Sequence, residues 1–279
     1  MNITDLVDLA LKEDIGPGDH TTLSCIEPGL IKKAELIVKD EGIIAGIELA
    51  EMICKQFDAE LNFIPKLKDG DQVKNGDRAF YLEGKAQSLL QIERLVLNYM
   101  QRMSGIATLT KKYTDALEGL SCKLLDTRKT TPGFRYFEKW AVRIGGAYNH
   151  RYALYDMIMI KDNHVDYAGG IIKAIDKVNQ YLKDQSLNLK REIEVRNFNE
   201  LDVVLAHGGI DRIMLDNFTV TDLKKAVTLI NKQYETEASG GITLETIRAY
   251  AETGVDFISS GALTHSYKSM DLSLKAIEG

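Results

Sequence analysis

The spacing of hydrophobic residues changes along the chain near residue 120. From Cys122 onward, short runs that are apolar on both faces alternate with longer stretches in which apolar residues recur at helical spacing. The runs predict strands at 123–127, 155–162, 191–196, 212–217, 236–240 and 256–264. The stretches between them predict helices at 134–146, 167–184, 199–209, 219–234 and 243–254. Repeated strand–helix units form a parallel sheet, and six strands are too few to close an eight-stranded barrel. We therefore expect an incomplete barrel or an open sheet.

The first 110 residues follow a different pattern. Short apolar runs within 32–46 and 61–84 are split at glycines, including the pairs Asp69-Gly70 and Asn75-Gly76, as in antiparallel strands and hairpins. Helices are predicted over 1–16, around Ile47–Phe57 and over 88–117, the last interrupted near Ser104-Gly105. We predict an α+β domain over 1–110, packed on an incomplete parallel α/β barrel over 111–267. A C-terminal helix over 268–279 is expected to pack back on the first domain.

The composition is that of an ordinary globular protein, with 44% hydrophobic and 27% charged residues. A net charge of -6 argues against a broad surface for nucleic acid or an anionic membrane. The three cysteines are far apart, which favours reduced thiols over disulfides or zinc. The acidic N-terminus lacks the features of a signal peptide, and no apolar run is long enough to span a bilayer. We predict a cytoplasmic protein without nucleic-acid or membrane partners.

Charged and small residues mark the carboxyl ends of the predicted strands, which is where barrel enzymes place their catalytic groups. The segment 126–164 has seven Lys and Arg residues against four Asp and Glu, a net charge of +3. It places His150 and Arg151 between the first two strands. The strand ends carry, in order, Thr127, Arg128 and Lys129; Lys161 to His164; Glu192 and Glu194; Asp216 and Asn217; Ser239, Gly240 and Gly241; Ser259, Ser260 and Gly261. A local cationic excess indicates a site for a small anion, although most charge clusters are solvated surface groups.

The residues at the other strand ends indicate which ligands and which type of reaction the site suits. The Ser-Gly-Gly and Ser-Ser-Gly turns lead towards helices, so their backbone N–H groups can hold a phosphate, although either alone is more often a plain turn. Glu194 and Asp216 can bind a metal, hold sugar hydroxyls or stabilise an oxocarbenium-like transition state, or each can pair with a structural Lys or Arg. His150 and His164 can be hydrogen-bonded loop residues, and no spacing supports zinc. Together these groups fit glycosyl transfer from a phosphorylated sugar to an anionic partner.

In order and spacing, the motifs resemble those of the quinolinate phosphoribosyltransferases, also called carboxylating nicotinate-nucleotide pyrophosphorylases. The resemblance covers nearly the whole chain. It rests on Lys12-Glu13-Asp14, Gly18-Asp19-x-Thr21-Thr22, Glu93-Arg94, Gly145-Gly146, Asn149-His150-Arg151 and the runs 104–108, 126–133, 161–164, 215–217, 237–242 and 260–265. Arg196 departs from the pattern, because the family commonly has an acid there, and this changes only the local charge.

The resemblance implies an activity, a cofactor and an assembly. Phosphoribosyl would pass from phosphoribosyl pyrophosphate (PRPP) to quinolinate with decarboxylation, giving nicotinate mononucleotide, pyrophosphate and CO2 in de novo NAD biosynthesis. The implied cofactor is Mg2+. The active site is expected at the interface of a homodimer or hexamer, with Arg94 reaching into the neighbouring barrel.

The resemblance and the chemistry of a dianionic substrate together assign roles to the motif residues. Forked guanidinium groups suit carboxylates, so we expect quinolinate to bind Arg94, Arg128, His150 and Arg151, with Thr127 beside them. The predicted catalytic residues are Lys129 and Lys161, which reach a carboxylate or pyrophosphate, and Glu194 and Asp216, which hold ribose hydroxyls or Mg2+ and stabilise charge at the anomeric carbon. The 5′-phosphate is expected to bind Ser239, Gly240, Gly241, Ser260 and Gly261.

Other functions agree less well with the residues of this chain. A related phosphoribosyltransferase of the same fold would act on nicotinate or another pyridine acid, but several converging cations favour a dicarboxylate. A non-catalytic sensor of phosphorylated metabolites would have lost Glu194, Asp216 or the cations, and this chain keeps them. A purine-type enzyme is disfavoured, because Glu13-Asp14 and Thr21-Thr22 only vaguely match its motifs. Paralogues associated with molybdate transport are expected to diverge at 161–164, which this chain retains.

Overall fold

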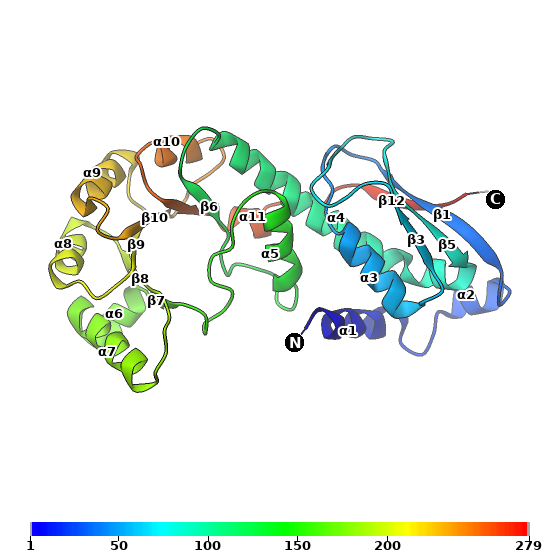
Figure 1. Ribbon diagram of the computed structural model, residues 1–279, viewed down its shortest axis with the longest axis horizontal. Coiled ribbons are helices and arrows are strands. Elements are labelled where there is room, and N and C mark those ends of the chain that lie inside the picture. The colour runs from blue at the N-terminus through cyan, green and yellow to red at the C-terminus, as the bar shows by residue number, and fades with distance from the viewer. Residues whose placement is uncertain (1, 278–279) are drawn as a thin grey trace. The chain divides into compact units, whose positions relative to one another are not determined.

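The computed structural model of the protein describes residues 2–277, which form two compact units (Figure 1). Unit 1 comprises Met1–Lys111, Thr130–Gly146 and Leu263–Gly279, and unit 2 comprises Lys112–Lys129 and Ala147–Ala262. The division therefore differs from a single cut at 110/111, because the chain returns to unit 1 between residues 130 and 146. Aromatic packing explains this return. The rings of Phe134 and Phe137 lie 4.9 and 4.7 Å from the ring of Tyr99.

Unit 1 is built on a four-stranded antiparallel sheet in the order β12-β1-β5-β3, with β2 and β4 forming a separate pair. Alternation buries one face of the sheet, where Leu36, Phe80 and Leu82 are fully inaccessible. Its strands are β1 (Ile31–Val38), β2 (Gly42–Ile43), β3 (Asn62–Pro65), β4 (Gln72–Val73), β5 (Arg78–Lys85) and β12 (Leu272–Ile277). Its helices are α1 (Ile3–Ile15), α2 (His20–Cys25), α3 (Ile47–Phe57), α5 (Arg135–Ile144) and most of α4 (Ala86–Ala116).

Helix α4 is continuous, so the predicted interruption near Ser104-Gly105 is wrong. Both small residues serve close packing instead. The Ser104 hydroxyl accepts a hydrogen bond from the Ala45 backbone N–H at 2.9 Å. A Cβ on Gly105 would lie 2.3 Å from the carbonyl oxygen of Lys268, so only glycine lets that backbone approach the helix.

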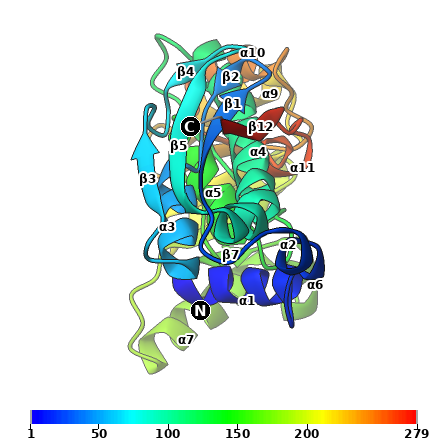
Figure 2. The same cartoon turned by 90° about the vertical axis from the view of Figure 1, so that its right-hand side faces the viewer.

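The predicted C-terminal helix over 268–279 is also wrong across the described residues, because β12 occupies Leu272–Ile277. Its buried residues, Leu272 and Leu274, recur with the period of two that a strand requires. β12 pairs antiparallel with β1 (Figure 2). The strand register places Leu274 opposite Leu36. This pairing satisfies the backbone N–H and C=O groups at the edge of β1. That gain outweighs the helix propensity of the residues in the segment. Residues 278–279 lie outside the described part of the chain.

Unit 2 is built on a parallel sheet whose strands follow the order β6-β11-β10-β9-β8-β7. The strands are β6 (Lys123–Leu125), β7 (Ile158–Ile160), β8 (Arg191–Val195), β9 (Arg212–Asp216), β10 (Glu235–Ser239) and β11 (Phe257–Ser259). The helices are α6 (Asp162–Ala168), α7 (Ile171–Asp184), α8 (Phe198–His207), α9 (Val220–Ile230), α10 (Ile247–Ala251) and α11 (Ala262–His265), which runs into unit 1. β6 and β7 occupy opposite edges of this sheet, so the barrel is incomplete. The predicted α/β fold class is confirmed.

One predicted helix of unit 2 divides into two. Residues 167–184 were expected to form a single helix, but α6 ends at Ala168 and α7 begins at Ile171. Gly169 and Gly170 separate them with φ values of 87° and 121°, which L residues rarely adopt.

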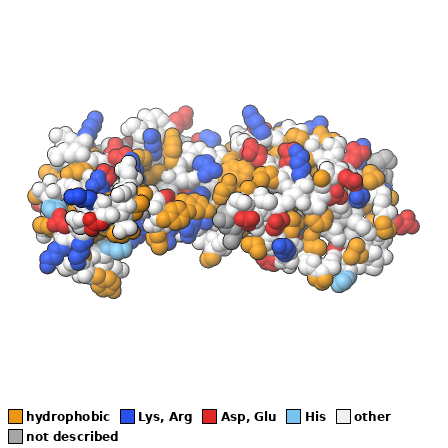
Figure 3. All heavy atoms as spheres, turned by 60° about the horizontal axis from the view of Figure 1, so that its bottom comes forward, with side chains coloured by type: hydrophobic (Ala, Val, Ile, Leu, Met, Phe, Trp, Pro, Cys, Tyr) orange, Lys and Arg blue, Asp and Glu red, His pale blue; other side chains and the backbone are white. Residues whose placement is uncertain are grey.

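Within residues 2–277, none of the helices has the length and apolarity that a membrane span requires. Basic and acidic side chains are interspersed on the face that Figure 3 shows.

Candidate active site

A pocket of about 400 Å³ lies at the carboxyl ends of the parallel strands in unit 2. The predicted site residues that line it are Thr127, Arg128, Lys129, His150, Arg151, Lys161, Glu194, Asp216 and Ser239. Four further lining residues were not predicted: Met159, Met214, Glu237 and Ser259. Ser259 was named only as a polar strand end. Met159, Met214 and Glu237 each lie two positions before a predicted residue of the pocket (Lys161, Asp216 and Ser239), so strand alternation places both side chains of each pair on one face. That period of two was the sequence signal that could have identified them.

The cationic wall of the pocket comes from the first and last strands of the sheet. β6 leads into Thr127, Arg128 and Lys129, where the Lys129 backbone N–H donates to the Thr127 hydroxyl at 3.0 Å. Lys161 directly follows β7 on the opposite edge. Arg151 is half-buried, and burial together with the charge of Arg128 lowers the pKa of its guanidinium. Two guanidinium groups that repel one another in a pocket form a binding site for an anion with more than one negative charge.

The acidic wall comes from the neighbouring strands β8 and β9. Burial, followed by the charge of Asp216, raises the pKa of Glu194. Burial also raises the pKa of Asp216, whose Oδ2 accepts a 2.6 Å hydrogen bond from the Asn217 amide. The Lys161 Nζ lies 3.8 Å from Glu194 Oε2. Two neighbouring carboxylates in a polar pocket are oxygen donors of the kind that Mg2+ prefers, so this pair fits the predicted metal.

The predicted phosphate turns follow the adjacent strands β10 and β11. Ser239 lines the pocket, whereas Gly240, Gly241, Ser260 and Gly261 are not among its lining residues. Gly240 and Gly241 have φ values of 96° and 62°, and a Cβ on Gly240 would lie 2.2 Å from the Asn217 Oδ1. α11 begins directly after Gly261 but has four residues, and α10 begins only at Ile247. Any phosphate contact there would come from the turn itself rather than from a long helix.

Two other predicted residues have different surroundings. Arg94 is exposed on α4 in unit 1 and does not line the pocket of unit 2. His164 lies in the first turn of α6, where its Nδ1 accepts the backbone N–H of Lys161 at 3.0 Å. This contact agrees with a loop histidine that orders the start of a helix.

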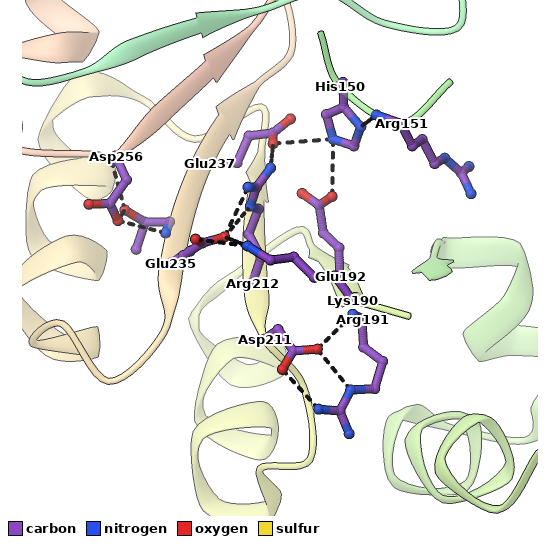
Figure 4. Close-up of polar contacts among 11 residues, drawn as sticks. His150, Arg151, Lys190, Arg191, Glu192, Asp211, Arg212, Glu235, Glu237 and Asp256 are labelled. Atoms are coloured by element: carbon purple, nitrogen blue, oxygen red, sulfur yellow. Dashed lines mark hydrogen bonds and ion pairs between the residues drawn. The ribbon is translucent and has the colours of Figure 1, made fainter. Parts of the chain in front are cut away.

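A buried polar layer borders the pocket, and two of its members, His150 and Glu237, also line it (Figure 4). His150 Nε2 lies 3.1 Å from Glu192 Oε2 and 3.3 Å from Glu237 Oε2, and both carboxylates are fully buried. Arg212 Nη1 donates to Glu237 Oε2 at 3.0 Å. Glu192 is fully buried and is not among the lining residues of the pocket, whereas Glu194 lines it.

The ionisation of His150 depends on two opposing features. Burial lowers the pKa of its imidazole, whereas the contacts with Glu192 and Glu237 raise it. A cation at neutral pH would need a proton on Nδ1, yet Nδ1 accepts the Arg151 backbone N–H at 2.6 Å. Two hydrogens cannot share so short a gap. We therefore assign His150 as the neutral Nε2–H tautomer, whose proton faces the carboxylates.

An incomplete parallel barrel with cations on one pocket wall and paired carboxylates on another defines an α/β enzyme for a small polyanionic substrate. The chain belongs to the quinolinate phosphoribosyl transferase family. The family's N-terminal domain matches residues 19–104, and its C-terminal domain matches residues 106–275.

Individual relatives agree with this membership over almost the full chain. Quinolinate phosphoribosyltransferase (decarboxylating) 1b of Nicotiana tabacum is 47% identical over 289 residues, covering 98% of this chain and 82% of that protein. The chloroplastic nicotinate-nucleotide pyrophosphorylase (carboxylating) of Arabidopsis thaliana is 47% identical, covering 97% and 81%. The solved nicotinate-nucleotide pyrophosphorylase of Francisella tularensis has a TM-score of 0.90 at 39% identity, covering 99% of this chain and 98% of that one.

Proposed function

We propose that this chain transfers the phosphoribosyl group of PRPP to quinolinate and releases CO2, forming nicotinate mononucleotide and pyrophosphate in de novo NAD biosynthesis. The observation that carries the proposal is the convergence of Arg128, Arg151 and Lys161 with the carboxylates of Glu194 and Asp216 on one pocket. Family membership and similarity over nearly the full chain support it.

In this proposal, quinolinate binds at the cationic wall. Its two carboxylates neutralise Arg128 and Arg151, and burial followed by the charge of Arg128 lowers the pKa of Arg151. Lys129 and Lys161 contact a carboxylate or the pyrophosphate, and Thr127 lies beside them. His150 also lines the pocket, although both of its ring nitrogens face protein groups.

The transfer step needs no covalent nucleophile, because pyrophosphate leaves readily once its charge is neutralised. Glu194 and Asp216 stabilise the positive charge that develops at the anomeric carbon and hold ribose hydroxyls. The same two carboxylates would hold Mg2+, which supplies neutralising charge for the pyrophosphate when bound. Ser239, Gly240, Gly241, Ser260 and Gly261 bind the 5′-phosphate. After transfer, the cationic ring nitrogen stabilises the carbanion left when CO2 departs.

The assembly and location form a separate part of the proposal. We infer a homodimer or hexamer in which Arg94 is contributed to the site by a neighbouring copy. The exposure of Arg94 on α4, outside the pocket of unit 2, supports this inference. A cytoplasmic location stays a prediction from the cysteine usage.

The decisive experiment measures CO2 and pyrophosphate release from PRPP and Mg2+ with either quinolinate or nicotinate. We expect turnover with quinolinate, none with nicotinate, and loss of turnover when EDTA removes the metal. Turnover with nicotinate alone would assign the protein a sister activity. Silence with both substrates would favour a binding protein instead.

A further inference from the structure

The loop that carries Arg151 has no regular secondary structure, yet it places a guanidinium on the pocket wall. Its start is held by Asp126, which is fully buried at the end of β6. Asp126 Oδ1 accepts the His150 backbone N–H at 2.8 Å, and its Oδ2 accepts the Asn149 amide at 2.6 Å. These bonds fix the backbone of His150 but leave the rotation of its ring to other contacts.

The imidazole ring of His150 links the buried layer to Arg151. Its Nδ1 accepts the backbone N–H of Arg151 at 2.6 Å. Its Nε2 points to Glu192 and Glu237, at 3.1 and 3.3 Å (Figure 4). The two carboxylates thus select both the direction of the ring and the nitrogen that carries its proton. Only that tautomer leaves Nδ1 able to accept the Arg151 N–H.

Burying two glutamates in the sheet costs folding free energy, so stability alone does not explain their presence. Glu192 and Glu237 are both fully buried, and apolar residues of similar volume would hold a barrel interior at least as well. Arg212, opposite both Glu192 and Glu235 in the strand register, donates to Glu237 at 3.0 Å and to Glu235 at 2.9 Å.

A metal ion is a second possible occupant of this layer, since His150, Glu192 and Glu237 offer ligand atoms within 4.8 Å of one another. The guanidinium of Arg212 already supplies positive charge to Glu237, however, and would repel a second cation. The positioning role therefore accounts for more of the contacts.

We propose that Glu192 and Glu237 are positioning residues for the quinolinate subsite, acting through His150 on Arg151. The inference rests on the proposed function. The carboxylates hold His150 in the Nε2–H tautomer, His150 holds the Arg151 backbone, and the guanidinium is thereby oriented, with its Nη1 donating to the Met157 carbonyl at 3.2 Å. His150 serves this chain of contacts rather than binding quinolinate through a ring nitrogen.

The kinetic test compares Glu192→Ala with Glu192→Gln, whose amide keeps an oxygen that can face His150 Nε2 as the carboxylate does. We expect Glu192→Ala to raise the KM for quinolinate about tenfold, equivalent to losing one hydrogen bond to a charged group. The KM for PRPP and kcat should stay unchanged, and Glu192→Gln should restore the quinolinate KM. Thr236→Val is the matched control, because Thr236 is 3% exposed on β10 but bonds Asp256 on the opposite face of the strand.

Several kinetic results would overturn the inference. These are equal impairment in Glu192→Ala and Glu192→Gln, a matching loss in kcat or in the KM for PRPP, or the same change in Thr236→Val. Each would indicate general damage to the barrel rather than loss of a positioning contact.

A spectroscopic test separates this inference from the proposed activity. In protein labelled with 15N-histidine, the His150 signals, assigned with His150→Gln, should show a proton on Nε2 and none on Nδ1. Glu192→Ala should disturb this tautomer, and Glu192→Gln should preserve it. A proton on Nδ1 in the wild type overturns the inference, even if Glu192→Ala fails to fold. Inactivity on quinolinate with the expected tautomer would instead contradict the proposed function alone.

Discussion

Charged side chains are arranged differently at the two ends of the parallel sheet in unit 2. At the amino ends of the strands, opposite charges are matched. Arg191 Nη2 lies 2.8 Å from Asp211 Oδ1, and Arg212 Nη2 lies 2.9 Å from Glu235 Oε2. Lys190 Nζ lies 3.1 Å from Oε1 of the same glutamate. At the carboxyl ends, like charges lie side by side. Burial and then the charge of Arg128 lower the pKa of Arg151, and burial and then the charge of Asp216 raise the pKa of Glu194, although Lys161 lies 3.8 Å from Glu194.

This difference separates groups that hold the fold from groups that await a ligand. Matched pairs have satisfied their electrostatic interactions within the protein, so a ligand gains little from them. Grouped like charges oppose folding and are relieved when an oppositely charged ligand binds, which is why strongly perturbed ionisation marks functional sites. The comparison predicts that variants at one end change activity, whereas variants at the other change stability.

The largest expected effect is on activity, from Arg128→Ala at the carboxyl end. Loss of a charged hydrogen bond to a substrate carboxylate costs about 1.5–3 kcal/mol, or roughly ten- to hundred-fold in kcat/KM for quinolinate. Lys129→Ala should fall in the same range. Thermal stability is measured alongside, because removing Arg128 also removes a positive charge from beside Arg151. Steady-state kinetics and a melting curve measure both quantities.

Lys190→Ala is the control for this prediction, because Lys190 is a cation of the same unit paired at the amino end. Its kinetics should match those of the wild type. Near-normal kinetics in both Arg128→Ala and Lys129→Ala would refute the assignment of the cationic wall.

A smaller effect, on stability, is expected from Asp211→Asn at the amino end. The hydrogen bonds from Arg191, chiefly, lower the pKa of Asp211, so its ionised form stabilises the fold above the unfolded pKa. Discounted for partial exposure, the loss should be about 1 kcal/mol at neutral pH, or about 2–4 °C in Tm. The difference from the wild type should vanish as the pH falls below about 4. Kinetics should not change.

The matched control is Glu252→Gln, which removes an ion pair of similar length whose side chains are more than half exposed. It should barely move Tm, because solvent screens such pairs. A Tm shift in Glu252→Gln equal to that in Asp211→Asn would mean that the matched charges of the sheet are ordinary surface pairs.

Sequence patterns predicted the sheet of unit 2 because each strand is marked locally, by apolar residues followed by a polar strand end. The same alternation could have identified Glu237, two residues before Ser239. It did not, because a buried glutamate lacks the apolar side chain that marks a core position. Glu192 was named with Glu194 at the end of its strand, and alternation places the two side chains on one face. Its contact with His150 depends on a loop whose path the alternation does not specify.

The errors in unit 1 share a physical cause, which is that a distant segment decided the local structure. Gly105 suggested a helix break, but its missing side chain accommodates the backbone of Lys268. The residues 272–277 can form a helix as readily as a strand, and pairing with β1 decides between them. Residues 130–146 were assigned to the barrel, and packing on Tyr99 takes them to unit 1. None of these partners lies near its segment in the sequence.

The smallest predicted effect is a pH-dependent gain of stability in Glu194→Gln. Burial and Asp216 raise the pKa of Glu194, so ionising this group opposes folding. A raised pKa contributes stability that is present below the unfolded pKa and is lost as the pH rises through the folded pKa. Glu194→Gln avoids that loss, so its Tm should rise relative to the wild type between about pH 4 and pH 7, while its activity falls. Glu200→Gln should shift Tm with the opposite sign, because Arg196 outweighs burial and the pKa of Glu200 is lowered. Equal pH profiles for Glu194→Gln and the wild type would mean that the acidic wall carries no electrostatic strain, and the contrast between the two ends of the sheet would then rest on the cations alone.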